Sequence, residues 1–449
     1  MTVELTQVTS ETNSRPGDPY VIVSTDSHAG PTLEGDLRPY CPPQYLRDYD
    51  EFAEQLRRAR SGEGDGLDVP KNVRAVMTRP GDPANIEDPY HRERESARVR
   101  AWDCTGQIDP HQRIRDMDLD GVAADVVFSG GQNGEVLPFS SWGGFDQGRL
   151  DVDVEHRAVG AHIFNTWMAD FISVEPKRHV GVIQITIDDI ELAVKEVEWG
   201  RSAGLGAMNL PAPQRTFPAY TEPLYEPLWS ACESLGLPLL THVGGGERAI
   251  GVDGPMGNAM LQSEQGFMGR RGLWQLIFGG VFERHPDLKI VFTEQRQQWV
   301  AETLVHLDSV YEHVTGSNKA ARAQIPRKPS EYWETNCFIG GSFMAPFEAQ
   351  ARAEVGVKNL MWGTDYPHME GTWPHTALAL RNTFSGVPEE DVRAILGDNA
   401  VRVYGLDGAE LRKVADRIGP KPADVDHPLA PEEFPLFRGF AFRRIGAVS

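Results

Sequence analysis

Residues 20–30 read YVIVSTDSHAG, a short apolar run that passes directly into a polar segment with an acid and an imidazole. Residues 20–24 have the β-branched and aromatic composition that is typical of a buried strand. Side chains two positions apart on an extended chain point to the same side, so Asp26 and His28 are expected to face one point just past the strand. A carboxylate and an imidazole that converge in this way make half of a site for a divalent transition metal. The alternative is a strand that ends in a polar turn, with Asp26 as a cap and His28 exposed.

The composition is that of an ordinary globular protein, with 40% hydrophobic and 24% charged residues. A formal net charge of −21 argues against nucleic acid or an anionic membrane as a partner. The four cysteines lie far apart without a C-x-x-C pair, which indicates a reducing compartment. Neither a signal peptide nor a long apolar run is apparent. We therefore expect a cytoplasmic protein that acts on a small-molecule substrate.

Three segments lie outside the regular part of the chain. Residues 1–18 are polar and are expected to form a disordered leader. Residues 30–110 are rich in Pro, Gly, Arg and Asp, with one short charged helix expected at 44–60, and a long insertion of this kind is typical of a lid or an inter-subunit arm. Residues 406–449 contain five prolines and are expected to form a C-terminal extension on the surface or on a neighbouring subunit. The insertion and this extension favour a homo-oligomer, with a dimer as the expected form.

Apolar strands alternate with helices through residues 19–405. The strands are expected at 20–24, 122–129, 180–185, 206–210, 238–242, 288–293, 332–339 and 359–364. Helices are expected at 112–119, 151–174, 190–202, 222–235, 273–282, 299–313, 344–354 and 388–396, with a Gly- and Met-rich loop at 243–272. Such alternation favours a parallel sheet, and eight repeats favour closure into a (β/α)8 TIM barrel of the α/β class, with a long insertion after its first strand. An open doubly wound sheet is the alternative, and it is weakened because no G-x-G-x-x-G follows the first strand.

Ionisable side chains stand at the carboxyl ends of four of these strands, where the active site of such a barrel lies. They are Asp26 and His28 at the first strand, His242 at the fifth, Glu294 at the sixth and Asp365 at the eighth. Burying these groups together without a cation would be costly for each of them. Their joint occurrence at one end of the barrel predicts a metal site.

Each of these residues also has a purely structural interpretation. His242 could be a buried histidine bonded to a backbone carbonyl, and Asp365 could start the turn at Tyr366. Glu294 could be a carboxylate favoured by a helix N-terminus, and His368 could be a polar surface residue. The metal interpretation is favoured because these alternatives do not explain why the residues share one end of the barrel.

Four segments together resemble the amidohydrolase superfamily. They are the Asp26-Ser27-His28 start, residues 115–128 (RDMDLDGVAADVVF), His242, and residues 363–368 (GTDYPH). The similarity extends over roughly residues 19–405 and is strongest to the amidohydrolase-related branch, which includes aminocarboxymuconate-semialdehyde decarboxylase and the resorcylate-type decarboxylases. The resemblance implies a (β/α)8 barrel with one divalent metal ion, expected to be zinc, with manganese, iron or nickel as alternatives. It also implies that the metal ligands are Asp26, His28, His242 and Asp365, and that Asp365 lies close enough to transfer a proton.

The chain departs from this pattern in two places. The binuclear members need a bridging lysine or glutamate after the fourth strand, where this chain has Asn209 and Leu210, and this difference favours a single metal. The decarboxylase members carry a histidine after the sixth strand, where this chain has Glu294. An imidazole there can donate a hydrogen bond to a substrate oxygen and a carboxylate cannot, so this second difference argues for hydrolysis, with Glu294 as a fifth ligand or a base.

The expected reaction is hydrolysis of a small cyclic or aromatic carbonyl compound, such as an amide, an ester, a lactone or an activated C–C bond, by a metal-bound water. Asp365 or Glu294 would accept the proton of that water, and His368 would protonate the leaving group or orient a ligand. Arg296 would hold a substrate carboxylate through two hydrogen bonds, or else pair with Glu294. Trp373 would contact the ring of the substrate, or else pack at the rim.

Two other functions stay open from the sequence. In a nonoxidative decarboxylase the metal would bind a carboxylate and a neighbouring hydroxyl or keto oxygen directly, without an attacking water. In a non-enzyme the barrel would have lost its activity and would serve as a ligand-binding or scaffold protein.

Overall fold

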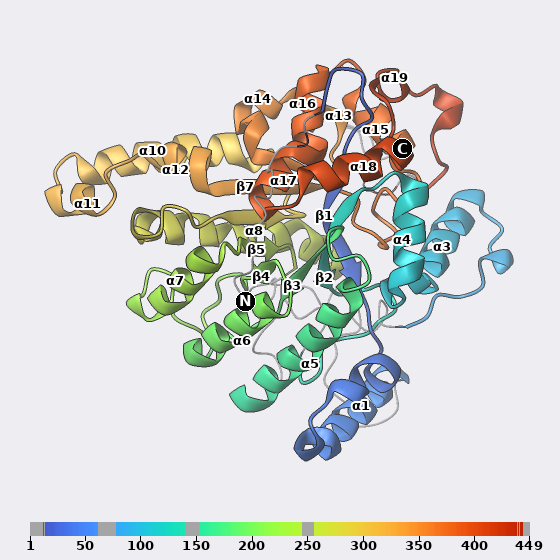
Figure 1. Ribbon diagram of the computed structural model, residues 1–449, viewed down its shortest axis with the longest axis horizontal. Helices are drawn as coiled ribbons and strands as arrows, with labels where there is room; N and C mark the ends of the chain where they lie inside the picture. Colours follow the sequence, from blue (N-terminus) through green and yellow to red (C-terminus); the bar gives the residue numbers. More distant parts are fainter. Residues whose placement is uncertain are drawn as a thin grey trace, which may run out of the picture.

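Eight parallel strands form a barrel at the centre of the molecule, and helices surround it (Figure 1). The computed structural model describes residues 12, 14–61, 78–140, 152–244, 256–437, 439, 441 and 442. The strands follow one another in chain order: β1 (Val23–Ala29), β2 (Ala124–Ser129), β3 (His179–Ile183), β4 (Ala207–Asn209), β5 (Leu239–His242), β6 (Ile290–Thr293), β7 (Cys337–Ser342) and β8 (Leu360–Gly363). The predicted (β/α)8 TIM barrel is therefore confirmed.

The segment that follows β8 joins the last strand to the first. Ser27 of β1 forms a parallel bridge with Tyr366. The backbone N–H of Asp365 donates to the carbonyl of Asp26 at 2.9 Å, and that of His28 donates to the carbonyl of Tyr366 at 2.6 Å. These bonds bring the polar residues of β1 beside those that follow β8.

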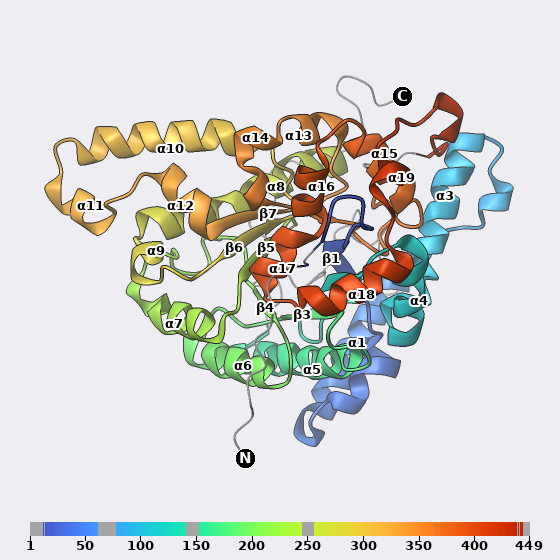
Figure 2. The same cartoon turned by 45° about the horizontal axis from the view of Figure 1, so that its top comes forward.

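Side chains of each strand alternate between two apolar layers, as the two-residue period of a strand requires. In β6, Ile290 and Phe292 belong to the layer between the strands and the outer helices, whereas Val291 belongs to a second cluster inside the barrel. Helices α17 (Asn399–Tyr404) and α18 (Gly408–Ile418) pack on this inner cluster (Figure 2). Because the cluster includes Val21 and Val23, the apolar plug fills the amino end of the barrel and leaves the carboxyl end for polar residues.

Helices between the strands form the outer layer (Figure 2). They are α5 (Val154–Ile172), α6 (Ile190–Ser202), α7 (Glu226–Leu235), α8 (Gly257–Phe278), α9 (Val281–Arg284), α10 (Trp299–Thr315), α11 (Lys319–Gln324), α12 (Pro329–Asn336), α13 (Pro346–Gln350), α14 (Arg352–Val355), α15 (Thr376–Phe384) and α16 (Glu389–Arg393). Asp153 and Asp189 cap α5 and α6 by accepting from backbone N–H groups of the first turn. Gly236 ends α7 in the left-handed conformation that glycine adopts without strain.

The insertion between β1 and β2 contains more helix than the sequence predicts. Helix α1 (Leu46–Ser61) agrees with the predicted helix, and α4 (Pro110–Asp120) agrees with the helix that precedes the second strand. Helix α3 (Pro89–Trp102) was not predicted, because its many charged residues form no continuous apolar stripe. Its start nevertheless carries two local signals, the capping side chain of Asp88 and a proline at the first helical position.

Three predicted elements are wrong in extent. The strand predicted at 20–24 is β1 at Val23–Ala29, so Asp26 and His28 lie inside the strand and not past it. The strand predicted at 332–339 begins only at Cys337, because Pro329 and the Glu331 carboxylate, which accepts from the N–H of Lys328, start helix α12. The segment predicted as a loop at 243–272 is helical from residue 257 onward, as part of α8, while residues 245–255 lie outside the described part.

The two terminal segments contact the body of the protein where they are described. In the predicted leader, the Thr12 hydroxyl donates to Asp398 at 2.6 Å, while residues 1–11 and 13 lie outside the described part. In the predicted C-terminal extension, α18 and α19 (Pro422–Val425) precede Glu433, which pairs with Arg381 of α15 at 2.6 Å.

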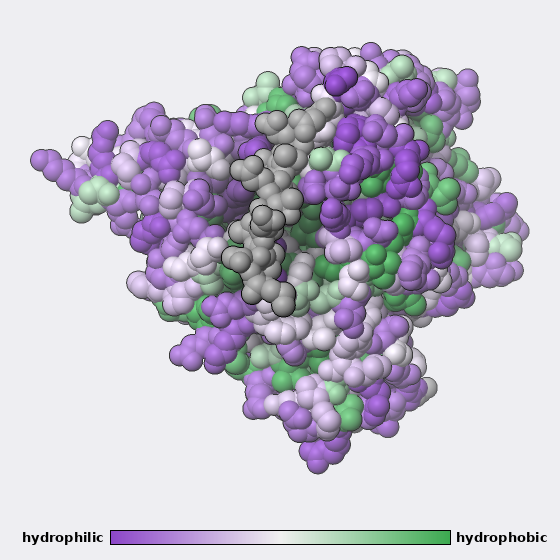
Figure 3. Space-filling view, in the orientation of Figure 1, coloured by the Kyte–Doolittle hydropathy of each residue, from purple (hydrophilic) through white to green (hydrophobic). Residues whose placement is uncertain are grey.

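The surface is mostly hydrophilic, as expected for a chain with many charged residues. Hydrophilic residues cover most of the face seen in Figure 3, including the end formed by α10 and α11. None of the described helices combines the length and the hydrophobicity that crossing a bilayer would require.

Candidate metal and active site

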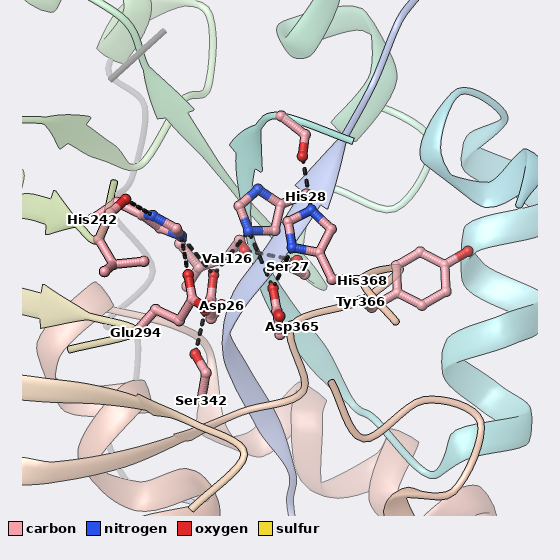
Figure 4. A network of polar contacts seen from close by, with 12 residues as sticks. Asp26, Ser27, His28, Val126, His242, Glu294, Ser342, Asp365, Tyr366 and His368 are labelled. Carbon is pink, nitrogen blue, oxygen red and sulfur yellow. Dashed lines mark hydrogen bonds and ion pairs between the residues drawn. The ribbon is translucent and has the colours of Figure 1, made fainter. Parts of the chain in front are cut away.

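Strand β1 places Asp26 and His28 at the centre of a polar cluster inside the barrel (Figure 4). His28 Nε2 lies 3.3 Å from Asp26 Oδ1 and 3.3 Å from Asp365 Oδ1. His242, from the end of β5, places its Nε2 3.3 Å from the same oxygen of Asp26. All four side chains are buried, with Asp26 and Asp365 fully inaccessible to solvent. The structure therefore brings together the four residues that were predicted to hold a metal.

Hydrogen bonds orient both imidazoles toward this centre. Nδ1 of His28 lies 2.8 Å from the carbonyl oxygen of Ser129, and Nδ1 of His242 lies 2.7 Å from that of Val243. A carbonyl only accepts, so each Nδ1 carries a proton and each Nε2 faces the carboxylates, where it can bind a metal once it is unprotonated. This is the arrangement that metal-binding histidines adopt.

Buried atoms of the cluster lack ordinary hydrogen-bond partners. Nε2 of His28 and both carboxylate oxygens of Asp365 are buried and make no hydrogen bond of ordinary geometry, only ion-pair contacts at 3.0–3.3 Å. Leaving such groups unsatisfied is costly, and a cation between them would satisfy all three atoms. Ligating atoms of Asp26, His28 and His242 lie within 4.8 Å of one another, as do those of His28, Asp365 and His368. The donor set of imidazole nitrogens and carboxylate oxygens fits one divalent transition metal.

The electrostatics of the cluster favour positive charge at its centre. Burial opposes ionisation, but contacts with His242 and His28 hold the pKa of Asp26 well below its usual range. Burial alone would lower the pKa of His28. Its contacts with Asp26 and Asp365 outweigh this effect and raise that pKa to about 10. The two shifts together favour positive charge between the carboxylates, and a divalent ion would supply it.

Glu294 lies at the edge of this cluster. Its Oε2 is 3.6 Å from Nε2 of His242, and its side chain is 14% exposed. Burial, followed by the charges of Asp365, Asp26 and Glu370, raises the pKa of Glu294 well above its ordinary value. Its backbone has a φ of 57°, a left-handed conformation that a non-glycine residue adopts at some cost. Burial beside other acids therefore favours the protonated form of this carboxyl group, the form that can donate a hydrogen bond.

His368 links the centre to the loop after β2. Its Nδ1 lies 3.0 Å from Asp365 Oδ1, and its Nε2 lies 2.8 Å from the carbonyl of Gly130 (Figure 4). Its ring stacks on that of His28, with centroids 4.1 Å apart. Nε2 donates to the carbonyl, so Nδ1 and Asp365 can share one proton.

A buried network behind β1 holds the metal-site residues from the outside. The guanidinium of Arg113 in α4 pairs with Asp125 at 2.7 Å and donates to the Ser27 hydroxyl at 2.6 Å and to the His28 carbonyl at 2.8 Å. Asp125 in turn contacts His179 Nδ1 at 2.7 Å. The sequence analysis assigned Arg113 no role, since an arginine on a charged helix gives no sign that it is buried.

The predicted substrate-binding residues lie on different sides of the centre. Arg296 is exposed and lines a cavity of about 400 Å³ that also includes Glu294 and Glu370. Trp373 packs edge-on against the ring of Tyr366, with centroids 5.1 Å apart, and is not among the residues that line this cavity. The structure therefore brings Arg296, but not Trp373, to the cavity wall.

The cavity includes two charged residues to which the sequence analysis gave no role. Arg270 enters it from α8, in the part of the chain predicted as a loop, and burial followed by the charge of Arg296 lowers its pKa to about 10. Glu370, beyond β8, accepts a hydrogen bond from Gln132 at 2.9 Å, and burial raises its pKa. The position of Glu370 near the GTDYPH segment was the one sequence signal for either residue.

Comparison with known proteins agrees with this geometry. The amidohydrolase family model matches residues 138–406, more than half of the chain. The 2-amino-3-carboxymuconate-6-semialdehyde decarboxylase of Dictyostelium discoideum is 26% identical over 338 residues, which are 72% of this chain and 81% of that protein. The structure of 5-carboxyvanillate decarboxylase from Sphingomonas paucimobilis has a TM-score of 0.59 at 20% identity, covering 86% of this chain and 99% of that one. A variant of the enzyme from Novosphingobium aromaticivorans, with bound manganese, has a TM-score of 0.61 at 17% identity and covers 86% and 97%.

These comparisons contradict the predicted hydrolase activity. The related sequence is a decarboxylase, and so are both solved neighbours described above, which share the fold. The prediction rested on a single departure, the Glu294 carboxylate, although burial beside other acids raises the pKa of this group and favours its hydrogen-bond-donating form. The alternative of a nonoxidative decarboxylase fits the comparisons better.

Proposed function

Since the chain belongs to the amidohydrolase family, we propose that it is a metal-dependent nonoxidative decarboxylase of a small aromatic or unsaturated carboxylic acid. The observation that carries this proposal is the convergence of Asp26, His28, His242 and Asp365 in a chain whose related sequence is a decarboxylase. The same comparisons favour an enzyme over a barrel that only binds ligands. Formation of a dimer and a cytoplasmic location stay predictions.

The four residues would hold one divalent ion, with His28 and His242 providing Nε2 and Asp26 and Asp365 providing carboxylate oxygens. Such an ion supplies positive charge that orients a carboxylate with a neighbouring hydroxyl or keto oxygen and offsets the negative charge that develops as carbon dioxide leaves. Manganese in a structural neighbour supports a transition metal of this kind, with zinc, iron or nickel as alternatives.

Decarboxylation replaces the lost carboxyl group by a proton, so the site needs a proton donor. Asp365 and His368 supply it in this proposal, because Oδ1 and Nδ1 lie 3.0 Å apart and His368 donates its other N–H to Gly130. The C–C bond electrons stay on the ring carbon, which takes the proton shared by this pair, and carbon dioxide departs. Proton return from solvent to the pair completes the cycle.

In this proposal the carboxyl group of Glu294, in its protonated form, donates a hydrogen bond to the substrate. It lies 3.6 Å from His242 and lines the cavity, so its carboxyl group can reach an oxygen of an acid bound at the centre. This supports decarboxylation in a chain that lacks the histidine found after the sixth strand of other decarboxylases.

Metal content and carbon dioxide release together test the proposal. We expect about one equivalent of metal by elemental analysis in protein purified without chelator, and almost none in an Asp26→Ala/His242→Ala variant that keeps its circular dichroism spectrum. We expect the metal-loaded wild type, and not the variant, to release carbon dioxide from a panel of 2-hydroxybenzoic acids and unsaturated acids. A folded wild type that takes up no metal, or a loaded one that decarboxylates no member of the panel, would contradict the proposal.

A further inference from the structure

A buried tyrosine lies in the turn that follows β8. Tyr366 comes directly after the metal-site residue Asp365, and its ring points away from the metal centre (Figure 4). The side chain is 6% exposed, with the guanidinium carbon of Arg113 5.0 Å from its ring centroid and Trp373 packed edge-on against it. A hydroxyl group in such surroundings needs hydrogen-bond partners. These partners lie in the insertion between β1 and β2.

The hydroxyl group of Tyr366 takes part in two hydrogen bonds. It donates to Oδ2 of Asp116 in α4 at 2.6 Å, and Sγ of Cys104 lies 2.9 Å from its oxygen. A phenol has one proton, which goes to Asp116, so the thiol of Cys104 donates the second bond. Burial raises the pKa of this thiol, which therefore keeps the proton that the bond needs. The other carboxylate oxygen of Asp116 accepts from the side chain of Gln112 at 2.7 Å.

A glycine makes room for this hydroxyl group. A Cβ atom at Gly106 would lie 2.1 Å from the hydroxyl oxygen of Tyr366 and 2.9 Å from Oδ2 of Asp116. Any larger residue would push the phenol away from its acceptor, so the close approach of the chain requires glycine here. The insertion is therefore shaped to hold the tyrosine hydroxyl in one place.

The backbone of the same turn is attached to β1. The N–H of His28 donates to the carbonyl of Tyr366 at 2.6 Å, Ser27 forms a bridge with Tyr366, and the N–H of Asp365 donates to the carbonyl of Asp26 at 2.9 Å. Asp365 has a φ of 57°, a conformation that is costly for a non-glycine residue and persists only where the surroundings enforce it. A shift of Tyr366 would therefore move the carboxylate of Asp365 relative to His28.

We propose that Tyr366 is a positioning residue whose hydroxyl group anchors the turn after β8, so that the Asp365 carboxylate is held in place for metal binding and proton transfer. Asp116 and Cys104 act through Tyr366. This inference rests on the proposed function, because it takes Asp365 as a metal ligand and as the partner of His368 in proton transfer. It gives the insertion a part in the chemistry of residues that the strands carry.

Metal binding by variants that lack one hydroxyl group tests this role without turnover. Competition with a chromophoric chelator measures the dissociation constant for Mn²⁺, and the visible absorption spectrum of the Co²⁺-loaded protein reports the geometry of the ligands. Tyr366→Phe removes the hydroxyl group and keeps the ring. Tyr220→Phe is the matched control, because that hydroxyl group is also buried and donates at 2.6 Å, to the carbonyl of Pro211, in the layer between the strands and the outer helices. Urea denaturation measures the stability of each variant.

We expect Tyr366→Phe to weaken Mn²⁺ binding about ten- to hundred-fold, the usual effect of removing a group that orients a metal ligand. Its Co²⁺ spectrum should differ from that of the wild type. At saturating metal its kcat for an acid that the wild type decarboxylates should fall about tenfold or more with KM unchanged, because Asp365 takes part in proton transfer. Tyr220→Phe should lose stability in urea while keeping the metal affinity and the spectrum of the wild type.

Two substitutions at Asp116 check that the anchor acts through the hydroxyl group. Asp116→Asn keeps an oxygen that can accept from Tyr366, so it should bind Mn²⁺ as the wild type does. Asp116→Ala removes the acceptor and should weaken metal binding as Tyr366→Phe does. Combining Asp116→Ala with Tyr366→Phe should weaken binding no further, because the two residues act as one unit.

Two results would overturn the proposal. Tyr366→Phe could keep the metal affinity and the Co²⁺ spectrum of the wild type, which would make its hydroxyl group a contributor to stability alone. Tyr220→Phe could weaken metal binding as much as Tyr366→Phe does, which would show a general effect of stability and not of position. A loss of metal affinity confined to Tyr366→Phe, in a protein whose wild type decarboxylates no acid, would support the positioning role and contradict the proposed reaction instead.

Discussion

Strands carry three of the four residues of the candidate metal centre, whereas a helix and a loop carry the two arginines that line the adjoining cavity. Asp26, His28 and His242 lie in β1 and β5, where ladder hydrogen bonds fix the backbone. The fourth residue, Asp365, follows β8 with a φ of 57°, and its N–H donates to the Asp26 carbonyl of β1 at 2.9 Å. Arg270 and Arg296 lie on α8 and on the loop after β6, and their positions depend on packing of side chains. The difference teaches that backbone hydrogen bonds hold the candidate metal centre, whereas side-chain packing, which substitutions change more readily, holds the cavity wall.

The strongest test of this difference removes the support behind the metal centre. Replacing Arg113 by Met leaves Asp125 buried with one partner fewer and removes the bonds to Ser27 and the His28 carbonyl. We expect the free energy of unfolding to fall by about 3–5 kcal/mol, the usual effect of breaking a buried ion pair. We also expect weaker metal binding, because β1 loses the contacts that hold His28. Urea denaturation and metal titration measure the two effects.

Arg115→Met is the control for this substitution. Arg115 lies on the same helix but is exposed, and among the described residues it contacts the side chain of Gln112 and, at 4.0 Å, that of Asp109. Its replacement should change the free energy of unfolding by less than about 0.5 kcal/mol. Equal stability of the two variants would show that the metal centre does not need the network behind it.

The same contrast explains what the sequence predicted. The convergence of Asp26, His28, His242 and Asp365 could be predicted because strands are short apolar runs and their carboxyl ends meet at one end of a barrel. Those local patterns needed no knowledge of packing, even though the limits of β1 were placed too early. Glu294 was selected in the same way, but the rise in its pKa follows from acidic neighbours that are distant in the chain.

Arg270 and Arg113 could not be found in this way, because their roles follow from tertiary contacts. The glycines of α8 lower its helix propensity, so the segment is typical of a loop, whereas in the structure Gly269 is the point where the helix meets Gln295. Similarly, Tyr332 and Trp333 are typical of a strand, yet they pack in the core from helix α12.

A second test concerns pH and the contact between helix α4, which carries Arg113, and helix α15. Asp120, at the end of α4, accepts hydrogen bonds from the side chain and backbone of Thr376 after β8. Burial, opposed by these bonds and aided by Asp116, raises the pKa of Asp120 from 3.8 to about 7. The unfolded chain loses this proton first, so Asp120 makes the protein progressively less stable between about pH 4 and pH 7.

Asp120→Asn should remove this loss of stability. At pH 8 we expect the variant to be more stable than the wild type by about 1–3 kcal/mol, with the difference shrinking toward pH 4. Its amide can still accept from the backbone N–H of Thr376 and can donate to the hydroxyl. Thermal unfolding across this pH range measures the effect, and a variant that is less stable than the wild type at pH 8 would show that Asp120 is ionised without penalty.

The smallest expected effect distinguishes two glycines of the same helix. Alanine at position 269 would press on the Gln295 amide at 2.4 Å, whereas alanine at position 272 would touch Ile290 at an ordinary 4.0 Å. We expect Gly269→Ala to lower the free energy of unfolding by about 1–2 kcal/mol. Gly272→Ala should raise it by about 0.5–1 kcal/mol, because alanine favours the helix more than glycine does.

The pair also tests whether the cavity wall and the candidate metal centre move together. Moving α8 away from Gln295 moves Arg270 relative to the cavity, so Gly269→Ala should weaken substrate affinity while leaving metal content at the wild-type level. Gly272→Ala should change neither. If Gly269→Ala lost metal as well, the cavity wall and the metal centre would be one mechanical unit, and the strands alone would not account for the rigidity of the site.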